Sequence, residues 1–458
     1  MTKPAQSEMR DAPGASAALP GLFAFVAAAA LAVGFLKLGT PSVMENRISA
    51  PKSLGEIIFS SWPALVGQLA TGGAVVLGWL ALLGGGGLGE RGRTPRWILL
   101  APAIWLAWQF VASLDTVSGR LTVPTLLHFT VTTVWFYLGV LVLGRVRRLG
   151  AFRLVVLAGF SLMVLVGLEQ HFWGLEDTRK FFYARPELMA AAPPDFQAKL
   201  ASDRIWGTLF YPNAFAGGIL LLLPVSLAFL WQLTDGRFEP SARWVLVGLV
   251  AVPALGCLYW TGSKTGLLLA LGQGVAFLAF LPIPRKVKVN AGVAILVVGL
   301  AGFFLVFADY FKGGARSLGA RADYWRAAVT TFSRNPLNGS GPGTFMVPYQ
   351  QLKSEDSEMA RLAHNDYLQQ ASDSGGIGFA AFMAFVWGSV ILLWRKGVRS
   401  GDWEFRLIWL GLTGWALQIG MEFSLYIPGL AWPAFLLFGL LWGLPDKANP
   451  VDKPRDQN

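Results

Sequence analysis

The chain has 458 residues, of which 54% are hydrophobic and only 14% charged, and its mean hydropathy is +0.50. Soluble globular domains carry much less apolar sequence, so the composition excludes an ordinary soluble protein. The net charge of +11 does not indicate nucleic-acid binding, because the basic residues stand in short clusters between apolar runs.

The apolar runs predict an all-α polytopic membrane protein with about 12 transmembrane helices, because each run approaches the roughly 20 residues that a bilayer core requires. We place the spans near residues 20–39, 62–84, 97–114, 123–143, 154–172, 213–232, 244–262, 265–283, 289–309, 374–394, 405–424 and 427–444. The only cysteine, Cys257, lies within one of these runs, which excludes an intramolecular disulfide.

Basic residues between the spans predict the orientation. They cluster in alternate connections, at Arg91, Arg93, Arg96, Arg145, Arg147, Arg148, Arg153, Arg237, Arg243, Arg285, Lys286, Lys288, Arg395, Lys396, Arg399 and Arg406. The positive-inside rule assigns these connections and both tails, 1–19 and 446–458, to the cytoplasm. The transmembrane domain then covers 20–445, and its two long connections, 173–212 and 310–373, lie on the opposite face.

The second long connection contains a predicted amphipathic helix in "ARADYWRAAVTTFSRNP". Its apolar residues recur every three or four positions, which favours a helix lying on the membrane and ending before Pro336. The apolar positions are Tyr324, Trp325, Ala328, Val329 and Phe332. The glycine-rich turn "NPLNGSGPGTF" follows, and its free backbone N–H groups suit an anion, although such turns usually only reverse the chain.

Three basic side chains are predicted to lie on the face that carries the long connections. Lys264 stands in "TGSKTG" between two apolar runs, Arg321 begins the amphipathic helix, and His364 precedes the tenth span. One interpretation is a snorkelling lysine and an interfacial histidine at the membrane edge. The other is a set of cations, one of them titrating near neutrality, that binds an anion such as pyrophosphate.

Polar neighbours of these residues have two interpretations each. Asn213 in "YPNAF" either caps the sixth span or contacts substrate, and Asn365 and Asp366 either cap a helix or orient His364. In "SDSGGIGF", Ser372 and Asp373 are expected to cap the tenth span. The glycines 375, 376 and 378 are expected to leave a groove for a neighbouring helix or a lipid tail.

Four segments, in this order, resemble the bacterial O-antigen ligase and polymerase superfamily. They are "GTLFYPNAFAGGILLLLP", "TGSKTGLLLALG", "ARADYWRAAVTTFSRNPLNGSGPGTF" and "AHNDYLQQASDSGGIG", and "VGLEQHFWG" precedes them. The resemblance covers about residues 150–395. It implies a helical fold like that of the C-type glycosyltransferases, in the bacterial inner membrane, with the active site at the periplasmic face.

The resemblance also implies a function. Such proteins transfer a glycan from an undecaprenyl-diphosphate carrier to an acceptor, with no nucleotide sugar, metal or other cofactor. The acceptor is lipid A core for ligases, a second carrier-linked chain for polymerases, and a protein hydroxyl for related oligosaccharyltransferases. We expect a ligase; the alternatives are a polymerase of O-antigen or exopolysaccharide and a polysaccharide transporter or flippase.

The family's basic residues carry over to three positions as expected catalytic groups. Lys264 stands where the family usually has arginine, Arg321 matches the arginine before the tryptophan, and His364 matches the histidine of the His-Asn motif. Asn213, Asn365 and Asp366 are expected substrate contacts. Lysine keeps the positive charge but lacks the bidentate fork of arginine.

Overall fold

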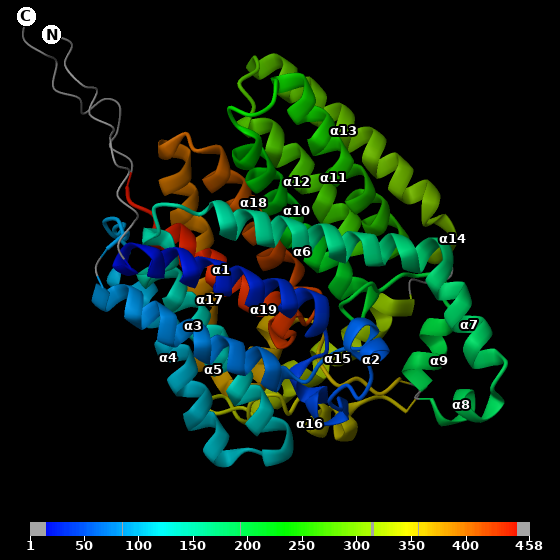
Figure 1. Cartoon of the computed structure of the whole chain (residues 1–458). Coiled ribbons are helices and arrows are strands. Elements are labelled where there is room, and N and C mark those ends of the chain that lie inside the picture. Colours follow the sequence, from blue (N-terminus) through cyan, green and yellow to red (C-terminus); the bar gives the residue numbers. More distant parts are fainter. Residues whose placement is uncertain (1–14, 85, 193, 313–315, 356, 447–458) are drawn as a thin grey trace, which may run out of the picture.

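The computed structural model describes residues 15–84, 86–192, 194–312, 316–355 and 357–446, which form a bundle of helices (Figure 1). Apart from one isolated bridge between Leu88 and Val146, the described residues form helices and irregular connections. Of the predicted tails, only residues 15–19 and 446 are described, and the remainder lies outside the described residues.

Every predicted span coincides with a helix. The helices are α1 (Ala15–Lys37), α3 (Ala64–Gly84), α4 (Arg96–Ala112), α5 (Gly119–Leu141), α6 (Gly150–Glu169), α10 (Pro212–Thr234), α11 (Pro240–Trp260), α12 (Lys264–Phe280), α13 (Arg285–Val306), α17 (Asp366–Ser400), α18 (Trp403–Gln418) and α19 (Pro428–Gly443). Among the described residues, nine helices are long and apolar enough to cross a membrane. The polytopic helical architecture is therefore confirmed, and the count of twelve spans stays a prediction.

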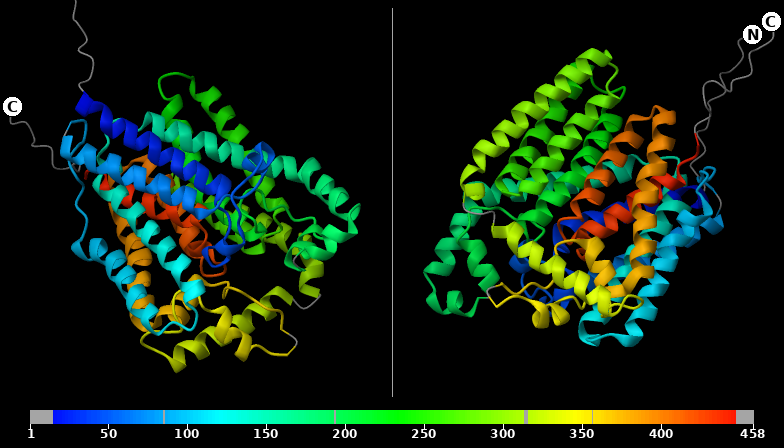
Figure 2. Two further views of the ribbon diagram at one scale, coloured as in Figure 1. Left: turned by 60° about the horizontal axis from the view of Figure 1, so that its bottom comes forward. Right: turned by 180° about the vertical axis from the view of Figure 1, so that it is seen from behind.

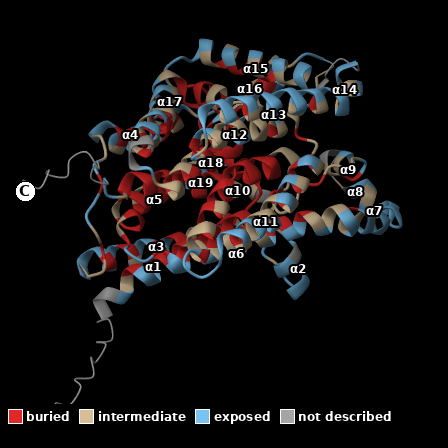
Figure 3. Cartoon of the chain, turned by 90° about the horizontal axis from the view of Figure 1, so that it is seen from above, coloured by how far each residue is buried: buried red, intermediate tan, exposed pale blue. Residues whose placement is uncertain are grey.

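The centre of the bundle is α19, in which every residue is buried (Figure 3). It packs closely on α5 through small residues: a Cβ atom at Gly439 would lie 2.2 Å from the carbonyl oxygen of Phe136. Close approach at glycines is typical of packing between membrane helices. By contrast α13 lies at the edge, with mostly exposed side chains, as expected for a helix that faces lipid.

The two ends of the bundle differ in kind. At one end, which we call the basic end, the short connections 86–95, 142–149, 235–239, 281–284 and 401–402 lie between the long helices. Two of these connections are joined by a hydrogen bond from Gly89 N–H to the Arg145 carbonyl (2.6 Å), and Gly92 N–H donates to the carbonyl of Gly443 at the end of α19 (3.1 Å).

At the opposite end, which we call the loop end, further helices cover the bundle (Figure 2). They are α2 (Leu54–Phe59), α7 (Leu175–Tyr183), α8 (Pro186–Ala191), α9 (Pro194–Leu200), α14 (Ala308–Lys312), α15 (Arg316–Arg334) and α16 (Met346–Leu352). The two long connections predicted from the sequence therefore lie at one end of the bundle, and each folds into helices of its own.

Helix α15 is the predicted amphipathic helix, and it ends before Pro336 as expected. Its apolar face packs largely against protein, however. Tyr324, Ala327 and Ala328 are buried in a small core with residues of α16 and of the segment that leads into α17, whereas Val329 is exposed. The interpretation of this face as a membrane-contacting surface is therefore wrong for its buried part, which attaches α15 to the bundle.

Helix α17 has a kink, and the glycine-rich turn fits into it. Gly375 has a φ of +67°, which interrupts the helix and frees backbone carbonyls. The N–H groups of Ser340 and Gly341 donate to the carbonyls of Ser372 and Asp373, both at 2.9 Å. The turn therefore satisfies backbone groups that the kink would otherwise leave unpaired.

We predict that Gly375→Ala destabilises the protein strongly. Its Cβ atom would lie 1.9 Å from the Leu337 carbonyl oxygen, and the left-handed backbone adds about 1–2 kcal/mol for an L residue. Gly376→Ala is the matched control, because its Cβ atom would meet nothing closer than the Pro336 oxygen at 3.5 Å. The midpoint of thermal unfolding in detergent should fall for Gly375→Ala alone; equal midpoints would show that the turn is not seated as described.

Candidate active site

The centre of the site is Glu422, a buried carboxylate in the connection between α18 and α19 that sequence reasoning missed. Only 4% of its side chain is exposed. It forms an ion pair with Arg321, accepts a hydrogen bond from Asn213 Nδ2 (2.6 Å) and lies 3.2 Å from His364 Nδ1. Three residues predicted to form the site, from α10, from α15 and from the segment just before α17, therefore meet on one carboxylate.

A second residue that the sequence did not single out, Arg204, joins this cluster. Its Nη2 donates to Asn213 Oδ1 at 2.7 Å, and its Nε donates to the carbonyl of Thr261 at 2.6 Å. Burial lowers the pKa of the Arg204 guanidinium and Glu422 raises it, while Arg321 lowers it as a like charge. Arginine stays protonated under such shifts, so Arg204 is a permanent cation beside Asn213.

Lys264 is the first residue of α12, where Ser263 caps the helix by accepting from Gly266 N–H. Its ammonium lies 3.9 Å from the ring centroid of Tyr310 and 4.7 Å from that of Phe307. Contact with aromatic faces stabilises a cation that has left bulk water. Lys264 also lies within electrostatic range of Arg204 and Arg321.

Three cations, Lys264, Arg204 and Arg321, therefore lie within electrostatic range of one another, and the two arginines also act on the Glu422 carboxylate. Burial alone would raise the pKa of Glu422, but His364, Arg321 and Arg204 hold it below its ordinary value, so the carboxylate stays ionised. The positive charge still exceeds the negative charge of Glu422. Such a site attracts an anion with more than one charge.

The backbone and ring of His364 are held in an uncommon geometry. Its φ is +50°, in the left-handed region that residues other than glycine rarely adopt and that clusters at functional sites. The ring stacks on Tyr324 (centroids 5.8 Å apart) and packs edge-on against Phe423 (4.7 Å). Tyr324 is held in turn by its hydroxyl, which donates to Glu358 (2.8 Å). The imidazole is thus supported on two sides while 29% of its side chain is exposed.

The polar residues Asn213, Asn365 and Asp366 each had helix capping as one interpretation, and the structure shows capping for only one of them. Asn365 caps α17, since its Oδ1 accepts from Leu368 N–H at 3.0 Å. Asn213 does not cap α10, because the N-cap is Tyr211, so the capping interpretation is wrong for Asn213.

Asp366 neither caps the helix nor contacts His364. Its side chain is completely buried, and its carboxylate accepts from Leu425 N–H at 2.7 Å. Its backbone N–H donates to the carbonyl of Ile419 at 2.8 Å. Asp366 therefore holds both ends of the segment 419–425, which carries Glu422, and its burial leaves no exposed surface for a substrate contact.

The other two histidines lie outside the cluster. His128 is buried in α5, and its Nε2 lies 2.7 Å from the Leu425 carbonyl, so it also holds the segment that carries Glu422. His171 stacks on Trp260 with ring centroids 3.8 Å apart.

Two sequence signals could have revealed the missed residues. Glu422 in "GMEFSLY" is an isolated carboxylate between two apolar runs, and Arg204 lies shortly before the "GTLFYPN" segment. Within the described ranges, no group of three or more His, Cys, Asp and Glu side chains could hold a metal ion.

The apolar helices of the bundle define a polytopic membrane protein with a cluster of cations at its loop end. Residues 249–383 match a family described as O-antigen ligase. The resemblance to the O-antigen ligase superfamily is therefore confirmed over this segment, which contains Lys264, Arg321 and His364 but not Arg204, Asn213 or Glu422. No curated protein matches the chain. The match supports an enzyme of glycan transfer in lipopolysaccharide or polysaccharide biosynthesis, without separating ligase from polymerase.

We predict that Glu422→Gln destabilises the protein by about 3–5 kcal/mol, the usual cost of removing one partner of a buried ion pair. Arg204 and Arg321 would then repel each other without compensation. The control is Glu404→Gln at the basic end, which breaks the ion pair with Arg153 (2.8 Å) instead. Both variants should unfold at lower temperature in detergent.

Added pyrophosphate separates the two variants. It should restore stability to Glu422→Gln, because an anion can replace the lost negative charge, and it should have no such effect on Glu404→Gln. Equal responses of the two variants to pyrophosphate would mean that the cations around Glu422 do not form an anion site.

Proposed function

We propose that this protein transfers a glycan from an undecaprenyl-diphosphate carrier to an acceptor at the periplasmic face of the bacterial inner membrane. The observation that carries the proposal is the cluster of Lys264, Arg204 and Arg321, in which the two arginines and His364 act on buried Glu422. The basic end supports an orientation with both tails in the cytoplasm and the loop end in the periplasm.

The cations match the leaving group of this reaction. When the bond between the anomeric carbon and the phosphate oxygen breaks, its electron pair stays on the carrier diphosphate. Arg321, Arg204 and Lys264 then stabilise the growing negative charge, an effect worth about 10²–10³ in rate for a single well-placed donor. Lys264 acts here as a point charge, and the arginines supply planar forks that match phosphate oxygens.

His364 is the proposed general base. Glu422 lies beside Nδ1, so Nδ1 carries the proton and donates to the carboxylate, which leaves the lone pair on Nε2. The acceptor oxygen forms its bond to the anomeric carbon while its proton passes to Nε2. Glu422 acts as a positioning residue that sets the tautomer and stabilises the imidazolium that forms. Asn213 remains a proposed site residue, because its side chain donates a hydrogen bond to Glu422 and accepts one from Arg204.

A groove beside the kink of α17 suits the polyprenyl chain of the carrier. A cavity of about 450 Å³ lies between α4 and α17 and is lined by apolar residues that include Trp97, Ile104, Gly376 and Ala380. Of the three glycines expected to open a groove, only Gly376 lines this cavity. Gly375 packs on the 336–337 backbone and Gly378 on Ser374.

The possible functions within the family differ in the molecule that accepts the glycan. We favour lipid A core, which would make the protein an O-antigen ligase within a transmembrane domain of residues 20–445 and a core near 150–395. A polymerase that extends a second carrier-linked chain is the alternative, because both use the same donor. A transporter would move the carrier without breaking its glycosyl bond.

The proposal predicts that His364→Ala lowers the transfer rate by about 10²–10⁴, the usual contribution of a general base. Arg321→Ala should lower it by about 10²–10³ through lost charge stabilisation. His171→Ala is the matched control, a second histidine at the loop end that lies outside the cluster. The measurement is transfer in proteoliposomes with undecaprenyl-diphosphate glycan and several acceptors, at equal protein levels.

The acceptor that gains sugar in this assay separates ligase from polymerase. Wild-type rates for both His364→Ala and Arg321→Ala would overturn the assignment. Carrier flipping without consumption of the glycan would favour the transporter.

We also predict that EDTA leaves transfer unchanged, because arginine and lysine side chains supply the charge that a metal supplies in other glycosyltransferases. The same proteoliposome assay, run with EDTA and then with added Mg²⁺ or Mn²⁺, checks this. Loss of transfer in EDTA with recovery on adding a divalent cation would contradict the proposed mechanism.

A further inference from the structure

A second cavity lies at the basic end, far from the candidate active site. It has a volume of about 300 Å³, at the lower end of the range for small-ligand pockets, which is about 300–1,000 Å³. Asn213 in the site and Trp231 in the cavity wall lie near opposite ends of α10, roughly 27 Å apart at 1.5 Å per residue. The cavity is therefore not part of the cation cluster.

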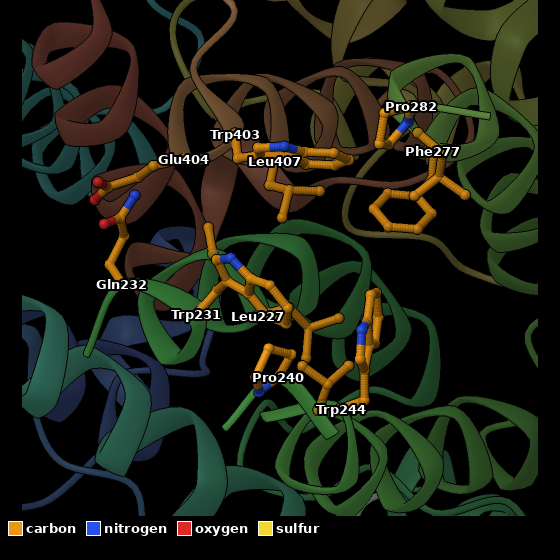
Figure 4. Close-up of a pocket in the computed structure, with 13 residues that line it drawn as sticks. Leu227, Trp231, Gln232, Pro240, Trp244, Phe277, Pro282, Trp403, Glu404 and Leu407 are labelled. Atoms are coloured by element: carbon orange, nitrogen blue, oxygen red, sulfur yellow. The ribbon is translucent and has the colours of Figure 1, made fainter. Parts of the chain in front are cut away.

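Four helices form the cavity with their basic-end turns (Figure 4). Leu227 and Trp231 of α10 and Pro240 and Trp244 of α11 face a second group across the space. The second group consists of Phe277, Pro282, Trp403 and Leu407, from α12, the turn that follows it, and α18. The walls are thus almost wholly apolar, which suits a hydrocarbon chain and not a sugar or a nucleotide.

The cavity runs from the protein interior toward the outside of the bundle. Ala228 and Leu407 in its wall are buried, whereas Trp244 is 53% exposed. The indoles of Trp231, Trp244 and Trp403 all lie near helix ends, the position of aromatic belts at membrane interfaces. The opening therefore lies at the depth where lipid headgroups meet their acyl chains.

The charged groups nearest the walls are already paired. Glu404 accepts hydrogen bonds from Nε and Nη2 of Arg153, both at 2.8 Å. Arg243 forms an ion pair with Asp235 (2.8 Å), and its guanidinium carbon lies 3.9 Å from the ring centroid of Trp231. These pairs leave little net charge at the cavity wall.

Other cations beside the cavity have no carboxylate partner within the part of the chain that the structure describes. Arg285 and Lys286 begin α13, three and four residues after the lining residue Pro282, and both are exposed. Arg237 is exposed in the connection between the two helices that supply Trp231 and Trp244. Among the described residues, no ion pair engages these three cations. The rim is therefore positively charged while the wall is apolar.

We propose that this cavity binds an anionic phospholipid of the membrane leaflet at the basic end. One acyl chain fills the space between the two groups of aromatic residues, and the phosphate headgroup meets Arg285 and Lys286. Basic residues at a membrane surface attract anionic headgroups. A phosphatidylcholine of the same chain length has no net charge, so the rim gives it no such advantage.

The experiment uses the full-length protein, delipidated in detergent, and measures the midpoint of thermal unfolding with added phosphatidylglycerol or phosphatidylcholine. Phosphatidylglycerol should raise the midpoint of the wild type, and native mass spectrometry should detect it bound. Val247→Trp, which fills the cavity, should abolish the shift. Val245→Trp is the matched control on the same helix, because Val245 is 63% exposed on the outer surface.

A second pair of variants tests the headgroup without altering the cavity. Replacing Arg285 and Lys286 together by glutamine should weaken phosphatidylglycerol binding by about tenfold or more. Replacing Arg147 and Arg148, two exposed arginines elsewhere at the basic end, should leave binding unchanged. Equal stabilisation by phosphatidylcholine would overturn the proposal. So would a shift that survives Val247→Trp or the loss of both rim cations.

Discussion

A carboxylate removed from water must be matched by cations and hydrogen-bond donors, and this requirement at Glu422 organises the loop end of the bundle. An unpaired buried charge would cost several kcal/mol. Arg321 from α15, His364 before α17, and Asn213 from α10 satisfy it, and these residues are far apart in the sequence. The Glu422 carboxylate thus attaches the long connection that contains α15 to the membrane helices. It also prevents the cations from repelling one another when no anionic substrate is bound.

The segment 419–426 that carries Glu422 is held in place by contacts below the site. His128 and Asp366 bind the backbone of Leu425, and the hydroxyl of Tyr426 donates to Asp373 at 2.9 Å. Asp373 also accepts from Gly343 N–H in the glycine-rich turn, which fills the kink of α17. The kink, the turn and the segment with Glu422 therefore form one connected structure.

The sequence predicted the membrane helices well because the bilayer imposes length and hydropathy on each one separately. The cations were also recognisable, since Lys264, Arg321 and His364 interrupt or border apolar runs and match family segments. Glu422 and Arg204 were missed because their importance arises from pairing across the fold, which no local pattern encodes. The same holds for Asp366, where the residue type suggested a substrate contact but complete burial gives it a positioning role. The buried face of α15 likewise depends on the neighbours it meets, which periodicity does not identify.

The two ends of the bundle both carry many basic residues, yet their chemistry differs. At the basic end several cations pair one to one with carboxylates, as in Arg153 with Glu404 and Lys396 with Asp446. At the loop end several cations share one buried carboxylate, so positive charge remains for a ligand. Arg237, Arg285 and Lys286, which no ion pair engages within the described part of the chain, lie instead on the exposed rim of the second cavity. A count of charges in the sequence therefore could indicate the orientation, but only the pairing distinguishes the proposed diphosphate site from the proposed lipid-binding rim.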